Sequence, residues 1–371
     1  MPEFFNVLPP DEARRLLLEN VTAITEVELL STVDALGRVT RESIYAPQPL
    51  PGFRRSSMDG YAVRAADTHG AGENLPAFLQ VTSEVPMGKP AAMSLNVGQA
   101  ALVHTGGMVP DSADAVVQLE HTQQIGPRDA DRFPFEIEVF RAVAAGQNVI
   151  QIGEDIDQGD VLLPGGRLLR PQDIGGLLAL GITRVAVVRR PIVAILATGD
   201  EVVPPDASMG PGQIRDINSH TVAGQVVRAG AIPEIMGIVS DNLDALREAT
   251  REGLRRSDML VISAGSSVSA RDMTVRVVEE LGQPGVLLHG VATRPGKPTI
   301  VGAVDGKPIL GLPGNPVSAM VQFDMFGIPA IFRLLGQSKM PARNWSIAYL
   351  GQNVASETGR EDYVPARLDE R

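Results

Sequence analysis

The stretch "PIVAILAT", residues 191–198, decides the fold. Six apolar residues follow its proline without a polar interruption, and the small polar residues "TGD" come next. A short unbroken apolar run bounded by turn residues predicts a strand buried on both faces. A strand covered on both faces needs helices above and below its sheet, so this stretch indicates an α/β domain.

The residues that follow alternate between helix-like and strand-like patterns. Apolar runs predict strands over 231–239, 258–265 and 307–314. Between them, helical spacing of apolar residues predicts helices over 218–230, 241–257 and 272–282. Strands that alternate with helices in this way favour a parallel, doubly wound sheet, and we assign it to residues 186–337.

Residues 48–145 have a different character. Short apolar alternations such as "AFLQVTSEV" (77–85) and "FEIEVFRAV" (135–143) are separated by Gly, Pro and Asp. This pattern predicts a small β-rich domain. Residues 146–185 resume turn and helix patterns, including a helix from Pro171 to just before Gly181. We therefore predict an N-terminal region made of residues 1–47 and 146–185, with the β-rich domain inserted into it.

Both ends of the chain carry weaker patterns. "EARRLLLENV" (12–21) predicts a helix that Asp11 caps and whose buried side is Leu16 to Leu18. Short extended and helical pieces follow, with a turn at Gly37. "RNWSIAYLGQNV" (343–354) is β-like, so residues 338–371 predict an incomplete C-terminal β-domain.

Composition excludes several classes of protein. The chain has 371 residues, a net charge of −11 and no cysteine. An acidic chain is a poor general nucleic-acid binder, and one without cysteine has neither disulfides nor a thiol nucleophile. Its first residues lack the pattern of a signal peptide, and no apolar run approaches the roughly 20 residues of a membrane span. We expect a cytoplasmic protein.

Small polar and acidic residues follow each predicted parallel strand. In a doubly wound sheet, ligands bind at the carboxyl ends of the strands, so these residues meet along one edge. Such loops also present backbone N–H groups to phosphates, and their carboxylates favour Mg²⁺ that bridges to a phosphate. The residues are Thr198, Gly199, Asp200, Glu201, Ser240, Asp241, Ser263, Gly265, Asp272, Gly314, Asn315, Pro316 and Ser318.

Structural interpretations stay open for each of these residues. Asp241 could simply cap the helix that it precedes, and Gly265 could lie in an ordinary strand-to-helix turn. Arg294 and Lys297 flank a Pro-Gly turn in "TRPGKPTIVG" (293–302) and are either a solvated basic loop or the cationic partners of a bound anion. The five histidines show no metal-ligand spacing, and neither a phosphate-binding P-loop nor a nucleophile elbow occurs.

"RSSMDGYAV" (55–63) in the β-rich section allows two interpretations. Asp59 and Gly60 could form a tight turn in which Gly60 adopts a positive φ. Alternatively, Asp59 is a metal or proton ligand that this turn presents.

Several motifs together resemble a known family. "PLPGFRRSSMDGYAV", "HTGGMVPDSADAVVQLE", "ATGDEVV", "GQIRDINSHTV", "RPGKPTIVG" and "GLPGNPVSAMVQF" occur in the order found in molybdopterin molybdenumtransferases, the MoeA family, which is related to the E domain of gephyrin. The resemblance implies an elongated homodimer that inserts molybdate into adenylylated molybdopterin and releases AMP with the help of Mg²⁺. It also implies an active site shared between the doubly wound domain of one subunit and the β-rich domain of the other.

The resemblance also assigns roles to residues. Those that match catalytic positions are Asp59, Glu201, Asp241 and Lys297. The implied metal ligands are Asp272, Asp241 and Glu201. Substrate contacts are implied for Ser57, Thr105, Thr198, Gly199, Asp200, Asn218, Ser263, Gly265, Arg294, Pro298, Gly314, Asn315, Pro316, Ser318 and Arg360.

The chain departs from the family pattern at several positions, including Arg294 in place of a lysine and "RRSS" before Met58 and Asp59. It has "SAGSSVSARDMT" (263–274) where the family usually has "SGGVSVGEADYT", and Gly290 replaces a family lysine. Two alternatives to the transferase therefore remain: a non-catalytic carrier of molybdopterin, and an unrelated nucleotide-phosphate hydrolase on the same type of sheet.

Overall fold

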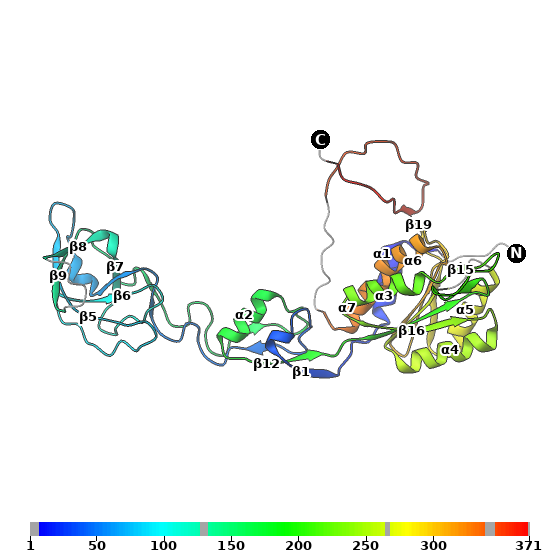
Figure 1. Ribbon diagram of the computed structural model, residues 1–371, viewed down its shortest axis with the longest axis horizontal. Coiled ribbons are helices and arrows are strands. Elements are labelled where there is room, and N and C mark those ends of the chain that lie inside the picture. The colour runs from blue at the N-terminus through cyan, green and yellow to red at the C-terminus, as the bar shows by residue number, and fades with distance from the viewer. Residues whose placement is uncertain (1–6, 127–132, 264–267, 338–345, 370–371) are drawn as a thin grey trace. The chain divides into compact units, whose positions relative to one another are not determined.

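The computed structural model describes residues 7–126, 133–263, 268–337 and 346–369. The chain forms two compact units (Figure 1). The first comprises Met1–Ser43, Pro164–Gly175 and Thr183–Arg371, and the second comprises Ile44–Leu163 and Gly176–Ile182. The four domain boundaries given above remain predictions.

A six-stranded sheet forms the centre of the first unit. Four of its strands are parallel, and two further strands continue the sheet antiparallel. In spatial order they are β16 (Ile232–Val239), β13 (Ile192–Thr198), β17 (Met259–Ser263), β21 (Lys307–Leu312), β20 (Ile300–Val304) and β18 (Pro284–His289). The α/β fold that the sequence predicts is confirmed.

The antiparallel pairing of β20 and β21 was not predicted, and its cause is local. Asp305 and Gly306 join β20 directly to β21, and both have positive φ values, 50° and 80°. A two-residue connection of this kind is the turn that the twist of a β-hairpin favours. The chain therefore returns beside itself instead of crossing over through a helix.

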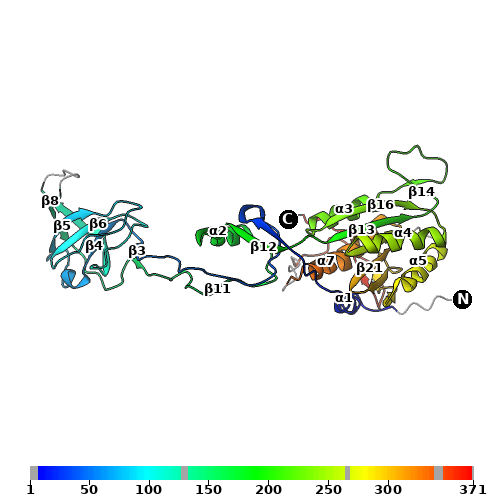
Figure 2. The same cartoon turned by 90° about the horizontal axis from the view of Figure 1, so that it is seen from below.

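Helices cover both faces of this sheet (Figures 1 and 2). Val193 and Ile195 of β13 pack into one core, while Ala194 and Leu196 pack into the other. The first core is closed by α1 (Pro10–Glu19), α3 (Asn218–Arg228), α6 (Pro316–Gln322) and α7 (Ile328–Leu334). The second is closed by α4 (Leu243–Arg256) and α5 (Val268–Leu281).

The N-terminal helix differs from its prediction in two details. Pro9 is its N-cap and Pro10 its first residue, so Asp11 lies inside the first turn and pairs with Arg14. Proline is favoured at the first helical position because its missing N–H would have no helical partner there. Of the predicted buried leucines only Leu17 is fully buried, and Ala13 shares its face.

Each unit also has a pair of short strands that come from distant parts of the sequence. β1 (Val27–Ser31) pairs with β12 (Arg184–Val188), and β2 (Ile44–Tyr45) pairs with β11 (Val161–Leu163). Gly37 has the positive φ expected of a turn, 72°. The predicted helix is α2 (Pro171–Ala179).

A second six-stranded sheet forms the β-rich unit. Its spatial order is β7 (Ala115–Gln118), β4 (Gly60–Val63), β6 (Gln99–Val103), β5 (Ala77–Glu84), β9 (Phe135–Val139) and β8 (Thr122–Ile125). The short strand β3 (Arg55–Ser56) pairs with β10 (Val149–Ile150) beside it. The predicted β-rich character is confirmed.

One helical run is long and apolar enough to span a membrane by length and composition alone. It covers Pro316–Leu334, and 61% of its most apolar window is buried inside the molecule. Phe323, Phe326 and Ile331 of this run pack into the core that it shares with α1 and α3. The run therefore has the burial of a core helix.

The C-terminal segment differs from its prediction. Residues 343–345 of the β-like stretch lie outside the described residues, and residues 346–354 form no strand. Between residues 346 and 369 the described chain has one short strand, β22 (Glu361–Asp362), which pairs with β19 (Thr293–Arg294). Alternation alone does not make a strand, because a strand also needs a neighbour for its backbone hydrogen bonds.

The hairpin turn at Gly306 provides a test of the fold. A Cβ atom at this position would lie 2.3 Å from Oγ1 of Thr22, besides the strain of a φ of +80°. We expect Gly306→Ala to reduce the free energy of unfolding by about 2–3 kcal/mol in urea titrations. The matched control is Gly230→Ala, whose φ is +87° with nothing near the added atom, and it should cost only about 1 kcal/mol. Equal costs would contradict the close packing of this turn on Thr22.

Candidate active site

A pocket of about 460 Å³ lies at the carboxyl ends of β13, β17 and β21. From β13 the chain crosses to β16 on one side and then to β17 on the other. Ligands of doubly wound sheets bind at such a reversal, because the two connections leave in opposite directions and open a crevice. The predicted residues that line this pocket are Thr198, Glu201, Asn218, Ser263, Gly314, Asn315 and Pro316.

Asn218, the first residue of α3, joins the segments around the pocket. Its Nδ2 donates to Oγ of Ser263 and to the carbonyl oxygen of Gly314, both at 2.9 Å. One amide therefore ties α3 to the end of β17 and to the loop after β21. Oδ1 of Asn218 and Oγ1 of Thr198 are buried without a hydrogen-bond partner among the described residues. Buried polar atoms are normally paired, so these two are available to a ligand.

The structure adds six pocket residues that sequence reasoning missed, two of which, Ala197 and Val202, flank the acidic turn after β13. Ile214 to Ile217 line the pocket from β15 (Ile214–Arg215) and the turn after it. The motif "GQIRDINSHTV" contains them, but only Asn218 was selected from it. Ile214 and Ile217 are exposed, and exposed isoleucines beside a pocket offer an apolar surface to a flat ring.

Three acidic residues gather at the turn after β13. Gly199 has a φ of 137°, and a Cβ atom there would lie 2.7 Å from Oε2 of Glu201. Glycine therefore lets the Glu201 carboxylate fold back over the turn. Oδ1 of Asp200 accepts a hydrogen bond of 3.1 Å from the backbone N–H of Asp241.

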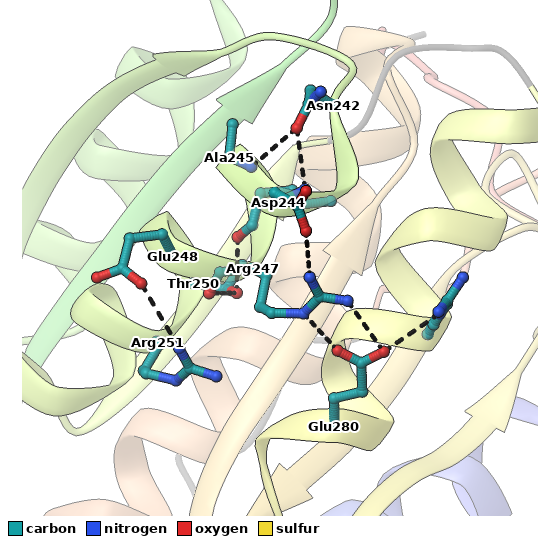
Figure 3. Close-up of polar contacts among 10 residues, drawn as sticks. Asn242, Asp244, Ala245, Arg247, Glu248, Thr250, Arg251 and Glu280 are labelled. Atoms are coloured by element: carbon teal, nitrogen blue, oxygen red, sulfur yellow. Dashed lines mark hydrogen bonds and ion pairs between the residues drawn. The ribbon is translucent and has the colours of Figure 1, made fainter.

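Asp241 is not the cap of the helix that it precedes. Asn242 caps α4, since its Oδ1 accepts from the N–H groups of Asp244 and Ala245 (Figure 3). Oδ1 of Asp241 is buried and has no hydrogen-bond partner in the described part of the chain. Burial raises the pKa of this carboxyl group, and the negative charges of Asp200 and Glu201 raise it further.

The residues predicted to bind metal are not all brought together. Within the described ranges, no three acidic or histidine side chains form a group that could hold a metal ion. Asp272 was expected where the loop meets the helix predicted from residue 272, but it lies exposed inside α5, because that helix begins at Val268. Asp241 and Glu201 remain neighbours, and Mg²⁺ often takes only one or two carboxylates from a protein. Gly265 lies outside the described residues.

A smaller pocket of about 280 Å³ contains two cations. Lys297 and Arg360 line it together with Thr293 and Glu357. Arg360 pairs with Glu357 at 2.6 Å, and its Nε lies 3.6 Å from Oδ1 of Asp362. Ile300, the first residue of β20, is opposite Gly311 near the carboxyl end of β21. The smaller pocket therefore lies toward the same edge of the sheet as the larger one.

The loop "GLPGNP" leads from β21 into α6, and its residues 314–316 line the larger pocket. Oδ1 of Asn315 caps α6 by accepting from the N–H groups of Val317 and Ser318, and Pro316 is the first helical residue. Ser318 is buried beneath this cap. Arg294 is exposed on β19, and Pro298 follows Lys297 in the neighbouring turn.

In the β-rich unit, Gly60 has a role other than the predicted one. It is absent from the positive-φ glycines of the described residues and begins strand β4. A Cβ atom on Gly60 would lie 2.0 Å from the carbonyl oxygen of Val117. Glycine is needed here because the backbone of β7 approaches closely.

Asp59 precedes that strand and is held by Thr105. Oδ1 of Asp59 accepts from the backbone N–H of Thr105 at 2.7 Å and from its hydroxyl group at 3.1 Å. These donors lower the pKa of Asp59, and nearby His104 lowers it further. His104 in turn contacts Glu84, at 2.9 Å. Asp59 is thus an exposed carboxylate that is kept ionised. Ser57 lies nearby in sequence and donates its N–H to Asn148.

The Thr105 contact can be tested by titration. We expect Thr105→Ala to raise the pKa of Asp59 toward its ordinary value, because one of the two donors to the ionised form is removed. Carboxyl NMR titration measures this pKa directly. Thr122→Ala removes a hydroxyl that bonds only to Leu119, so it should leave the pKa of Asp59 unchanged. An unchanged value in Thr105→Ala would contradict the contact.

The acidic turn can be tested by stability. A carboxyl group whose pKa is raised by folding destabilises the protein fully above the raised pKa, and this cost disappears as the pH falls to its unfolded-state pKa. We expect Asp241→Asn to increase the thermal midpoint by about 2 °C at pH 8 and to have little effect near pH 4. Exposed Asp206, in the neighbouring loop, provides the control Asp206→Asn. An increase in the thermal midpoint that does not depend on pH would exclude charge repulsion at Asp241 as its cause.

These features define a class of protein. An α/β sheet with a polar pocket at its reversal point, acidic residues on one side and cations on the other, is typical of domains that bind anionic small molecules of nucleotide size.

Comparisons with known proteins identify the family. Residues 8–181 match the family model "MoeA N-terminal region (domain I and II)", and residues 194–333 match "Probable molybdopterin binding domain". The molybdopterin molybdenumtransferase of Bacillus subtilis is 35% identical over 87% of this chain and 74% of its own length. That of Haemophilus influenzae is 32% identical over 96% and 85%.

Solved structures agree with this assignment. Two crystal structures of a molybdopterin biosynthesis MoeA protein from Pyrococcus horikoshii superpose with a TM-score of 0.73, at 36% and 33% identity. Each alignment covers 90% of this chain and 81% of the other. The chain belongs to the MoeA family of molybdenum cofactor biosynthesis proteins.

Proposed function

We propose that the protein is a molybdopterin molybdenumtransferase, which inserts molybdate into adenylylated molybdopterin and releases AMP. The observation that carries the proposal is the pairing of two pockets toward one edge of the sheet. The larger has the size and the unpaired polar atoms that a nucleotide needs, and the smaller holds Lys297 and Arg360. Relatives that carry this activity by name match most of the chain.

The larger pocket would bind the pterin nucleotide. Oγ1 of Thr198 and Oδ1 of Asn218 are the buried atoms free to bond with it. The apolar side chains of Ile214 and Ile217 would cover a flat ring. The other proposed contacts are Gly199, Asp200, Ser263, Gly265, Gly314, Asn315 and Pro316.

The smaller pocket would bind the oxyanion. Molybdate is a dianion, and an acidic protein needs local cations to hold it. Lys297 and Arg360 would provide this charge. Arg294, Pro298 and Ser318 are the neighbouring residues that we assign to the same subsite.

Asp241 and Glu201 would hold Mg²⁺. The unpaired Oδ1 of Asp241 and the mutual repulsion of the acidic side chains fit a cation at this turn. When bound, Mg²⁺ would neutralise charge on the phosphate groups of the nucleotide. The third residue that we assign to the metal is Asp272, which lies in α5.

We also propose a homodimer in which Asp59, Ser57 and Thr105 of one copy complete the active site in the larger pocket of the other copy. Asp59 is exposed, as a residue that acts on a separate molecule must be, and Thr105 keeps its carboxylate ionised. No nucleic acid and no membrane enter this proposal, and we place the protein in the cytoplasm.

The experiment measures AMP release from adenylylated molybdopterin in the presence of Mg²⁺ and molybdate. We expect turnover by the wild-type protein and a loss of at least about 100-fold in Asp59→Ala and in Lys297→Ala. Co-expression of the two inactive variants should restore about a quarter of wild-type activity, because half of the dimers are mixed and each has one intact site.

Each result separates the alternatives. No AMP release from the wild type would contradict the transferase. Tight pterin binding without AMP release would favour the molybdopterin carrier instead. The exposed position of Asp272 and the altered loop 263–274 are the observations that support this alternative. Two inactive variants that never complement would contradict the shared site.

A further inference from the structure

Gln322, the last residue of α6, is completely buried, and its side-chain amide bonds to the backbone turn of residues 293–297. Its Nε2 donates to Oγ1 of Thr293 and to the carbonyl oxygen of Pro295, both at 3.0 Å. Both acceptors belong to the turn that carries Arg294 and Lys297. Within the described residues Oε1 of Gln322 has no hydrogen-bond partner, so Nε2 makes both bonds of this buried amide, and both go to this one turn.

The turn packs directly on this amide. Gly296 has a φ of +107°, and a Cβ atom there would lie 2.3 Å from Nε2 of Gln322. On its other side, the turn is held by its own bonds. Thr299 donates its hydroxyl and its N–H to the carbonyl oxygen of Gly296, and Val291 donates its N–H to that of Lys297. The backbone is fixed on both sides, while Arg294 and Lys297 remain exposed.

Helix α6 connects the two pockets. Its first residue, Pro316, and its cap, Asn315, line the larger pocket. Its last residue, Gln322, holds the turn that bears Lys297, which lines the smaller pocket. One helical segment and one buried amide therefore link the larger pocket to the turn that lines the smaller one.

We propose that Gln322 is a positioning residue for the oxyanion subsite, acting through Lys297. The expected effect on catalysis rests on the proposed function. The expected effect of Gln322 on the position of the turn does not depend on that function. Without the amide, the carbonyl oxygen of Pro295 and the hydroxyl of Thr293 lose their donor. The turn then moves relative to the larger pocket, and displacements of about 1 Å at a reacting site reduce rates by as much as 100-fold.

The experiment compares Gln322→Leu with Gln225→Leu in the full-length protein. Gln225 is a matched control because it is also a buried helix glutamine, and its Nε2 donates to the carbonyl oxygen of Met320 in α6 instead of to the turn. Thr293→Val is a second, milder variant that removes the hydroxyl acceptor while keeping its shape. If Gln322→Leu fails to fold, Thr293→Val tests whether the bond between residues 293 and 322 positions the turn.

The first readout is hydrogen exchange of the Val291 and Thr299 amides. We expect exchange to be about 10-fold faster in Gln322→Leu and faster to a smaller extent in Thr293→Val, with no change in Gln225→Leu. This readout does not depend on any activity. Unchanged exchange in both variants of the turn would overturn the proposal.

The second readout is the dependence of AMP release on molybdate and on the pterin nucleotide. We expect the KM for molybdate to rise about 10-fold in Gln322→Leu, with the KM for the nucleotide within about twofold of wild type. A merely structural role would reduce the active fraction without changing either KM. Faster exchange with an unchanged KM for molybdate would overturn the catalytic part. A wild type that releases no AMP would contradict the proposed function and leave the exchange result to decide the positioning.

Discussion

The burial of β13 on both faces is the constraint from which the active-site region follows. Alternate residues of this strand enter two different cores, so helices must cover both sides of the sheet. Covering both sides requires the connections to reverse direction at β13, with β16 on one side and β17 on the other. The reversal opens the crevice in which the larger pocket lies. The pocket is thus a consequence of how the central strand is buried.

Charge is distributed along this edge according to the loops that each strand carries. The turn after β13 brings together acidic side chains that repel one another, and the raised pKa of Asp241 records that repulsion. The cations belong to the turn before β20 and to the C-terminal segment. A protein with a net charge of −11 can therefore offer a local cationic site to an anion. Helix α6 lines the larger pocket through Asn315 and Pro316 and holds the turn of Lys297 through Gln322.

The β-rich unit holds the Asp59 carboxylate at its surface. Gly60 lets the backbone of β4 approach β7, and this fixes the residue just before it. The N–H and hydroxyl groups of Thr105 then orient Oδ1 of Asp59 and keep the group ionised. The sequence offered a turn and a ligand as alternatives for Asp59. The structure shows a held carboxylate beside a strand glycine, so the positive-φ turn was wrong.

By itself, the sequence determined the α/β fold, the β-rich section and most of the residues around the larger pocket. Each of these follows from local patterns, such as the apolar run at 191–198 and the small polar residues at strand ends. Only the tertiary structure decided that Asn242 rather than Asp241 caps α4, that residues 346–354 form no strand, and that Gln322 binds the turn of Lys297. These outcomes depend on which groups meet across long separations in the chain. Local periodicity carries no information about such long-range contacts, because the hydrogen-bond partners of a side chain depend on which segments pack together in the folded protein.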